Sequence, residues 1–161
     1  CQSVLHQLKE GVTEAAEIYA KVPERESQAP AVPELPGRGR KLLYLDDDQF
    51  TLNILSHVLE REGYTVFTES SFAGIYKYLF ENNVDLFITD VRMPGISGTK
   101  ICKMIRKTLP DLKVVLFSNI PDRELEELAQ MCGATGWISK NKKPAEWLED
   151  IKALVSPLEK A

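Results

Sequence analysis

Three adjacent aspartates, Asp46, Asp47 and Asp48, directly follow the apolar segment KLLYL (41–45). Neighbouring carboxylates repel each other unless a cation, a helix N-terminus or water offsets their charge. A divalent cation shared with further oxygen ligands would make Asp46 and Asp47 tolerable as neighbours. Asp48 precedes a predicted helix, where free backbone N–H groups and the helix dipole would offset its charge. We therefore expect a metal-binding pair and, beside it, a helix N-cap.

Further polar side chains follow other apolar segments of the chain. Three such segments end in this way: VDLFIT (84–89) at Asp90, LKVVLF (112–117) at Ser118 and GWIS (136–139) at Lys140. If the segments are parallel strands, their carboxyl ends meet at one edge of a sheet, where ligands bind. Each residue alone is a weak signal, because strand-end aspartates, serines and lysines are usually turn formers, caps and solvated charges.

Taken together, three carboxylates, a hydroxyl and an ammonium group suit phosphoryl chemistry. Mg²⁺ prefers hard oxygen ligands and usually takes one or two carboxylates together with phosphate and water. A carboxylate can also attack phosphorus to form an aspartyl phosphate. A hydroxyl and an ammonium group can then stabilise the phosphoryl oxygens, because such transfers depend mainly on positioning and charge neutralisation.

The elements that would position these groups alternate regularly from Lys41 onward. The pattern predicts strands at 41–45, 64–68, 84–89, 112–117 and 136–139, and helices at 49–62, 71–83, 99–108, 121–131 and 144–155. Such alternation indicates a parallel sheet covered by helices on both faces, with right-handed crossovers. The nearly continuous apolar runs VDLFIT and LKVVLF are typical of strands buried on both faces.

The first 40 residues have a different pattern. Apolar residues recur at heptad spacing, at Leu5, Leu8, Val12, Ala15, Tyr19 and Val22. This predicts an N-terminal amphipathic helix over 1–22, which needs a partner because it is short and contains glycine. The partner is either a neighbour within a longer parent protein or a second copy in a homodimer. Residues 23–40 contain four prolines and no periodicity, which predicts a linker before a domain at 41–157.

Composition excludes several function classes. A formal net charge of −4 over 161 residues argues against nucleic acid as a partner, and no apolar run approaches the roughly 20 residues that span a membrane. The three cysteines form no CxxC pair, so we expect reduced thiols in a cytoplasmic protein. The histidines, His6 and His57, fall within predicted helices rather than at strand ends, which argues against a Ser-His-Asp hydrolase.

The region from about Lys41 to Val155 resembles the receiver domain of bacterial two-component response regulators. LLYLDDD (42–48) resembles the family's first strand with its acidic pair, and ITDVRMPGISG (88–98) resembles the segment around the phosphoacceptor. VVLFS (114–118) and GATGWISK (133–140) resemble the strands that carry the hydroxyl and the lysine. The resemblance implies a flavodoxin-like (βα)5 fold, doubly wound, with strand order 2-1-3-4-5.

The resemblance also implies a role for each site residue. By position, the phosphoacceptor would be Asp90. The ligands of Mg²⁺ would be Asp46, Asp47, Asp90 and the backbone carbonyl of Arg92. Phosphoryl oxygens would be bound by Ser118 and Lys140, and the switch would consist of Ser118 and Trp137. The phosphoryl donor would be a histidine kinase or a phosphotransfer protein, and a protein target or an upstream domain would read the result. Such a domain is a signalling switch rather than an enzyme with turnover. Trp137 is equally consistent with a half-buried aromatic residue that closes its strand.

The sequence departs from the family pattern at four positions. Ser118 replaces a commoner threonine, and Asn119 stands where a small residue is usual. Asn141 replaces the usual proline, and a trans bond is expected there because a cis bond without proline costs about 2.5–4 kcal/mol. Arg92 either reaches over the phosphate or is simply exposed to solvent.

Two alternatives to a phosphoacceptor remain open. The domain could be an interaction module of the same fold with weak or no phosphorylation, which Asn119 and Asn141 leave possible. It could also be a haloacid-dehalogenase-like phosphatase with Asp46 and Asp48 as its D-x-D pair. The second alternative gives Asp90 no role, and Phe50 stands where that family has threonine or valine.

Overall fold

The computed structural model describes residues 34–155, which contain one five-stranded parallel sheet. Its strands are β1 (Lys41–Leu45), β2 (Thr65–Glu69), β3 (Leu86–Thr89), β4 (Lys113–Ser118) and β5 (Gly136–Ser139). Their order in the sheet is β2-β1-β3-β4-β5, and every pairing is parallel. This confirms the flavodoxin-like strand order 2-1-3-4-5.

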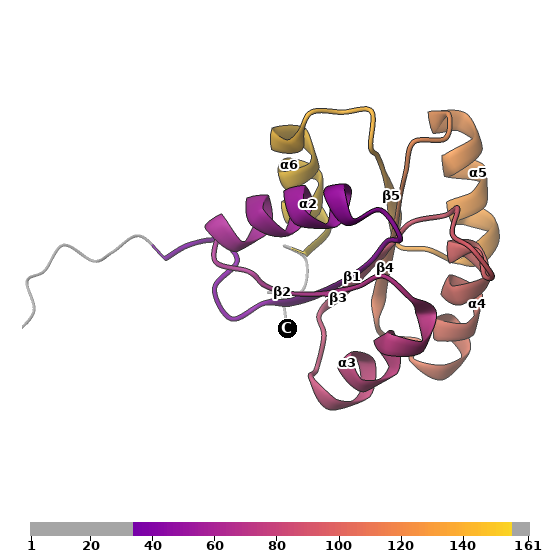
Figure 1. Cartoon of the computed structure of the whole chain (residues 1–161), viewed down its shortest axis with the longest axis horizontal. Helices are drawn as coiled ribbons and strands as arrows, with labels where there is room; N and C mark the ends of the chain where they lie inside the picture. Colours follow the sequence, from indigo (N-terminus) through magenta and orange to yellow (C-terminus); the bar gives the residue numbers. More distant parts are fainter. Residues whose placement is uncertain (1–33, 156–161) are drawn as a thin grey trace, which may run out of the picture. The chain divides into compact units, whose positions relative to one another are not determined.

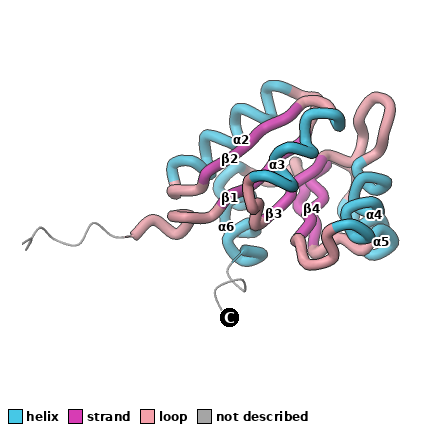
Figure 2. Tube along the Cα trace, turned by 90° about the horizontal axis from the view of Figure 1, so that it is seen from below, coloured by secondary structure: helices cyan, strands magenta, loops and turns pink. Residues whose placement is uncertain are grey.

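Helices cover both faces of the sheet (Figure 1). Their bounds are α2 (Gln49–Arg61), α3 (Ile75–Glu81), α4 (Gly98–Thr108), α5 (Asp122–Cys132) and α6 (Pro144–Val155), and a 3-10 turn, η1 (Phe72–Gly74), precedes α3. Helices α2 and α6 lie on one face, and α3, α4 and α5 lie on the other. Figure 2 shows the strands enclosed between these layers.

The two faces of the sheet bury separate hydrophobic cores. Successive strand residues point to opposite faces, so Leu42 and Tyr44 of β1 face α2 and α6, whereas Leu43 and Leu45 face the other helices. All four side chains are fully buried. Burying such a side chain contributes about 1.5–3 kcal/mol, and burial on both faces explains why the central strands are apolar throughout.

Three helix starts differ from the sequence prediction. Helix α4 begins at Gly98, one residue earlier than predicted, with Ser97 as its N-cap. The predicted helix at 71–83 begins with the 3-10 turn η1, and Ser71 makes no capping hydrogen bond through its side chain. Helix α5 begins at Asp122, since Pro121 has the extended ψ angle of 141° and is the N-cap rather than a residue of the first turn.

The predicted N-terminal helix at 1–22, and with it the homodimer, lie outside the described residues. Of the predicted linker, only residues 34–40 are described. Residues 36–39 form a turn, and Gly37 is buried against Tyr64, with its N–H donating to the Glu62 carbonyl at 2.8 Å. Within residues 34–155, no helix has the length and apolarity needed to cross a membrane.

Candidate functional site

Three aspartates meet at the carboxyl edge of the sheet. Asp46 follows β1 and Asp90 follows β3, and these strands are neighbours in which Leu45 is in register with Thr89. The N–H of Asp90 donates to the Leu45 carbonyl at 3.0 Å. One carboxylate oxygen from each of Asp46, Asp47 and Asp90 lies within 4.8 Å of the others. Pairing of two adjacent parallel strands therefore assembles the acidic cluster that the sequence predicted.

Asp46 is the buried member of this cluster and has no solvent exposure. Its Oδ1 accepts the backbone N–H of Asp48 at 2.9 Å. Its Oδ2 accepts the hydroxyl of Tyr44 at 2.5 Å and lies 2.6 Å from Nζ of Lys140. A buried carboxylate needs such partners, because an unpaired buried charge is strongly destabilising.

Lys140 connects two of the carboxylates. It directly follows β5, and its Nζ lies 2.6 Å from Asp46 Oδ2 and 3.5 Å from Asp90 Oδ1. Its backbone N–H donates to the Ser118 carbonyl at 2.8 Å, and its ammonium group lies 5.4 Å from the centre of the Phe117 ring. The ammonium group therefore offsets part of the repulsion between Asp46 and Asp90.

Asp90 is buried to 7% exposure but keeps one carboxylate oxygen without a donor. Oδ1 accepts the backbone N–H of Val91 at 2.8 Å, whereas no donor among residues 34–155 contacts Oδ2. Burial raises the pKa of Asp90 above its ordinary value, and the charge of Asp46 adds to this rise while Lys140 opposes it. A more basic carboxylate with a free oxygen is suited to nucleophilic attack.

Ser118 and the loops after β4 and β5 complete the site. Ser118 is the last residue of β4, is 1% exposed, and accepts the N–H of Ile120 at 3.4 Å. A polar depression opens in front of Asp90, and its other lining residues are Asp48, Thr51, Arg92, Asn119, Lys140 and Asn141. The Asn141 side-chain amide donates to the Asn119 carbonyl at 3.3 Å, which ties the two loops together.

Arg92 and Asn141, two residues that differ from the family pattern, cause no strain in the backbone of the site. Arg92 is exposed and forms no ion pair with any other residue in the range 34–155. The peptide bond between Lys140 and Asn141 is trans, as expected in the absence of proline.

Trp137 lies opposite Leu116 in register, is half-buried, and packs against the core beneath α3, α4 and α5. This placement leaves its switching role a prediction.

Asp48 caps a helix, as the sequence predicted, whereas Asp46 and Asp47 belong to the acidic cluster. Its side chain accepts the Phe50 N–H at 3.1 Å and the Thr51 hydroxyl, so it is the N-cap of α2. The Thr51 hydrogen bond is the main reason why the pKa of Asp48 is lowered. The predicted N-cap is confirmed.

Tyr44 and Gly98 support the site but were missed in the sequence. Tyr44 precedes Asp46 by two residues, so strand alternation places both on the same face, and this spacing is the signal that was available. Gly98 leaves no room for a side chain, because a Cβ there would clash with the Asp90 carbonyl oxygen at 1.9 Å. Its N–H also donates to the Val91 carbonyl at 2.9 Å.

A doubly wound parallel sheet with clustered carboxylates, a hydroxyl and a lysine at its carboxyl edge defines a receiver-type α/β domain. The chain belongs to the family described as "Response regulator receiver domain", whose model matches residues 42–152. Receiver domains of two-component response regulators are phosphoacceptor signalling modules that interact with histidine kinases or phosphotransfer proteins. Membership of this family removes the haloacid-dehalogenase alternative.

Similar proteins occur in plants, bacteria and archaea. The putative two-component response regulator ARR13 of Arabidopsis thaliana is 34% identical over 110 residues, which cover 65% of this chain and 19% of ARR13. The transcriptional regulatory protein GltR of Pseudomonas aeruginosa is 30% identical over 123 residues, which cover 75% of this chain and 51% of GltR. The chain thus spans about half or less of the length of these relatives.

Solved receiver domains share the fold. The BeF3-activated receiver domain of DrrB has 27% sequence identity and a TM-score of 0.65, covering 73% of this chain and 97% of that structure. The CheY-like receiver domain protein of Methanospirillum hungatei JF-1 has 26% identity and a TM-score of 0.68, covering 75% of this chain and 97% of that structure.

Proposed function

We propose that Asp90 is the phosphoacceptor and that a histidine kinase or phosphotransfer protein supplies the phosphoryl group. The observation that carries this proposal is the cluster itself. Asp90 has a free carboxylate oxygen, a raised pKa, two carboxylates within 4.8 Å and an ammonium group 3.5 Å away. No single part of this arrangement is rare, but the combination provides a nucleophile together with the means to hold a cation and a phosphoryl group.

The donor atoms of the cluster fit Mg²⁺. Carboxylate oxygens are the ligands that Mg²⁺ prefers, and one oxygen from each of Asp46, Asp47 and Asp90 lies within 4.8 Å of the others, so a single cation can approach all three. We assign Asp46, Asp47, Asp90 and the backbone carbonyl of Arg92 as its ligands. When bound, Mg²⁺ supplies positive charge that neutralises the carboxylates and orients a phosphoryl oxygen.

The protein's own residues perform the transfer. Oδ2 of Asp90 attacks phosphorus, so that an oxygen–phosphorus bond forms while the bond from phosphorus to the donor's histidine nitrogen breaks. That nitrogen keeps the electron pair of the broken bond. Lys140 pairs with one phosphoryl oxygen, which its 3.5 Å approach to Asp90 prepares, and the Ser118 hydroxyl donates to another.

The output would be a change in the surface formed by residues 121–155. Ser118 ends the strand beside β5, and the loops after these strands are joined through Asn119 and Asn141. A hydrogen bond from Ser118 to the phosphoryl group would bias this region between two states that differ at Trp137. Cytoplasmic location and the upstream or downstream partner remain predictions.

Acetyl phosphate with Mg²⁺ tests the proposal. We expect the intact mass of the full chain to rise by one phosphoryl group, and this gain should be absent in Asp90→Asn and in chelator. Asp122→Asn is a matched control, because Asp122 is an exposed aspartate in the first turn of α5. Beryllofluoride should change the tryptophan fluorescence, and Trp137→Phe should remove that change. If wild type and Asp90→Asn respond alike, the domain is an interaction module rather than a phosphoacceptor.

A further inference from the structure

An apolar groove runs between α3 and α4, away from the acidic cluster. Its rim exposes three large side chains, Tyr76 at 45%, Phe80 at 55% and Met104 at 38%. The rings of Tyr76 and Phe80 are nearly parallel at 6.2 Å, and Phe72 packs edge-on against Tyr76 at 5.4 Å. These aromatic residues form a continuous row along one wall. Contiguous exposed apolar surface of this kind marks interaction sites.

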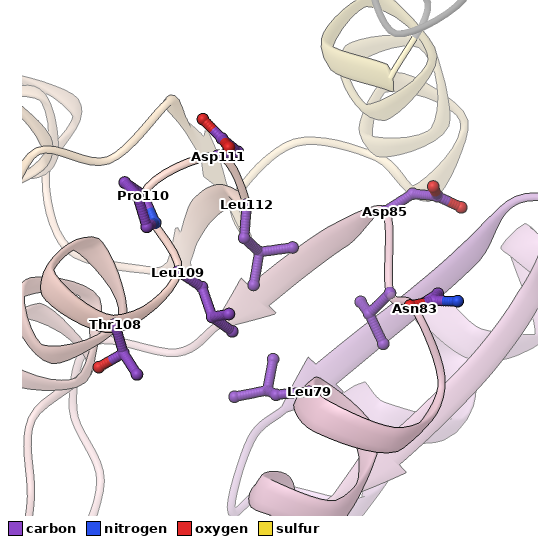
Figure 3. A pocket seen from close by; sticks show the side chains of 9 residues that line it. Leu79, Asn83, Asp85, Thr108, Leu109, Pro110, Asp111 and Leu112 are labelled. Atoms are coloured by element: carbon purple, nitrogen blue, oxygen red, sulfur yellow. The ribbon is translucent and has the colours of Figure 1, made fainter.

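The groove continues into a cavity at the amino edge of the sheet. Leu79, Thr108 and Leu109 line both the groove and the cavity. Figure 3 shows the side chains of Leu79 and Leu109 directed into this cavity, whereas Asp85 and Asp111 point away from its centre. The floor is therefore apolar, and the far end carries negative charge.

The wall formed by α4 is strongly basic. Its sequence, GTKICKMIRKT, contains four basic residues and no acidic residue. Lys100 and Lys107 stand four residues before and three residues after Met104, which places them beside it on the helix surface. Both are exposed, and neither forms an ion pair with any residue that the structure describes.

We propose that this groove binds an amphipathic helix from a partner protein, with an apolar stripe on the groove floor and acidic residues against α4. Helix-in-groove binding uses apolar anchors at i, i+3, i+4 and i+7, and complementary charge steers such partners and fixes their register. Asp85 and Asp111 lie at the end of the groove where α3 and α4 end, and Lys107 in the last turn of α4 offsets part of their charge.

Two other occupants fit the surface less well. A second copy of this chain in a symmetric dimer would place the same patch on both sides, so the lysines of α4 would face each other. An anionic membrane would match the charge, but a flat surface does not fill a groove between two helices. The proposal concerns a surface distinct from the phosphoacceptor site and does not depend on phosphorylation of Asp90.

A synthetic peptide provides the test. Helix α4 has 11 residues and is about 16 Å long, so a fluorescein-labelled helical peptide of about 14 residues, with a leucine stripe flanked by glutamates, spans the groove. We expect saturable binding to the full chain by anisotropy. Phe80→Ser and the double variant Lys100→Glu/Lys107→Glu should each weaken it about tenfold or more.

Controls separate the proposed site from general stickiness. Met131→Ser removes another exposed large side chain, at 59% exposure on α5, and Lys143→Glu reverses an exposed charge outside α3 and α4. Both should leave binding unchanged, and circular dichroism should show that all four variants are folded.

Several results would overturn the proposal. One is equal binding of a peptide in which lysines replace the glutamates. A second is binding to anionic vesicles, lost in Phe80→Ser, without peptide binding. A third is a dimer in sedimentation that Phe80→Ser dissociates. Binding that the groove variants leave unchanged would place the peptide elsewhere.

Discussion

Replacing Asp90 with asparagine should stabilise the metal-free protein at neutral pH. At an effective dielectric constant of about 20, repulsion between two carboxylates 4.8 Å apart is about 3.5 kcal/mol, and attraction to an ammonium group at 3.5 Å is about 5 kcal/mol. These opposing charge interactions largely cancel. The desolvation that raises the pKa of Asp90 therefore decides whether the substitution increases or decreases the free energy of unfolding. Asparagine keeps the oxygen that accepts the Val91 N–H and removes the buried charge.

The expected gain is about 1 kcal/mol in the free energy of unfolding, or about 3–5 °C in Tm for a folded region of this size. Because the pKa of Asp90 is raised in the native state, that state binds more protons than the unfolded chain in the window between the two pKa values. Wild-type stability therefore falls as pH rises through this window. The advantage of Asp90→Asn should be full above the native-state pKa of Asp90 and disappear in acid, below the unfolded pKa.

Thermal denaturation followed by circular dichroism, in chelator and in Mg²⁺, measures this effect. Saturating Mg²⁺ should raise the Tm of wild type more than that of Asp90→Asn, because at a given concentration the ligand that binds more tightly stabilises the native state more. Asp122→Asn should show no gain in chelator, since Asp122 is exposed at a helix N-terminus where negative charge is favourable. A lower Tm for Asp90→Asn than for wild type at neutral pH in chelator would refute the reasoning.

Three further predictions follow from the same contacts. In calorimetric titration, Asp47→Asn should weaken Mg²⁺ binding about tenfold or more. Asp48→Asn should leave the affinity nearly unchanged because Asp48 caps α2; equal losses in the two variants would contradict the separate roles of Asp47 and Asp48. Lys140→Met should lower the free energy of unfolding, measured with urea in the absence of metal, by about 3 kcal/mol, and should slow phosphorylation about 10²-fold. An unchanged phosphorylation rate would exclude a role of Lys140 in the transfer. Gly98→Ala should cost about 1–3 kcal/mol, because its Cβ would clash with the Asp90 carbonyl oxygen; an unchanged urea midpoint would show that the backbone moves freely there.

Much of the site was predictable because each group lies at the end of a strand or directly after it. The carboxyl ends of parallel strands meet at one edge, so the positions of Asp46, Asp90, Ser118 and Lys140 in the chain already indicate their proximity. The N-cap role of Asp48 was also predictable, since residue type and position suffice for a local hydrogen bond. The order of the strands, by contrast, came from the resemblance to receiver domains, because alternation alone specifies no order.

Two other features were missed for different reasons. The Tyr44 hydroxyl donates to Asp46 two residues further along the chain, so the spacing indicates the same face but not that the two side chains bond to each other. The apolar groove arises because Phe80 and Met104, from separate helices, stay exposed on either side of it. Helical periodicity shows which face of one helix is apolar but not how much of that face a neighbouring helix covers.

The most direct test of the central claim is to map the phosphorylated residue. The full chain is treated with acetyl phosphate and Mg²⁺, the acyl phosphate is reduced with borohydride, and peptides are sequenced by mass spectrometry. We expect homoserine at position 90, with Asp46, Asp47 and Asp48 unmodified. Modification at any of these three with Asp90 intact, or a phosphorylated product in Asp90→Asn equal to that of wild type, would contradict it.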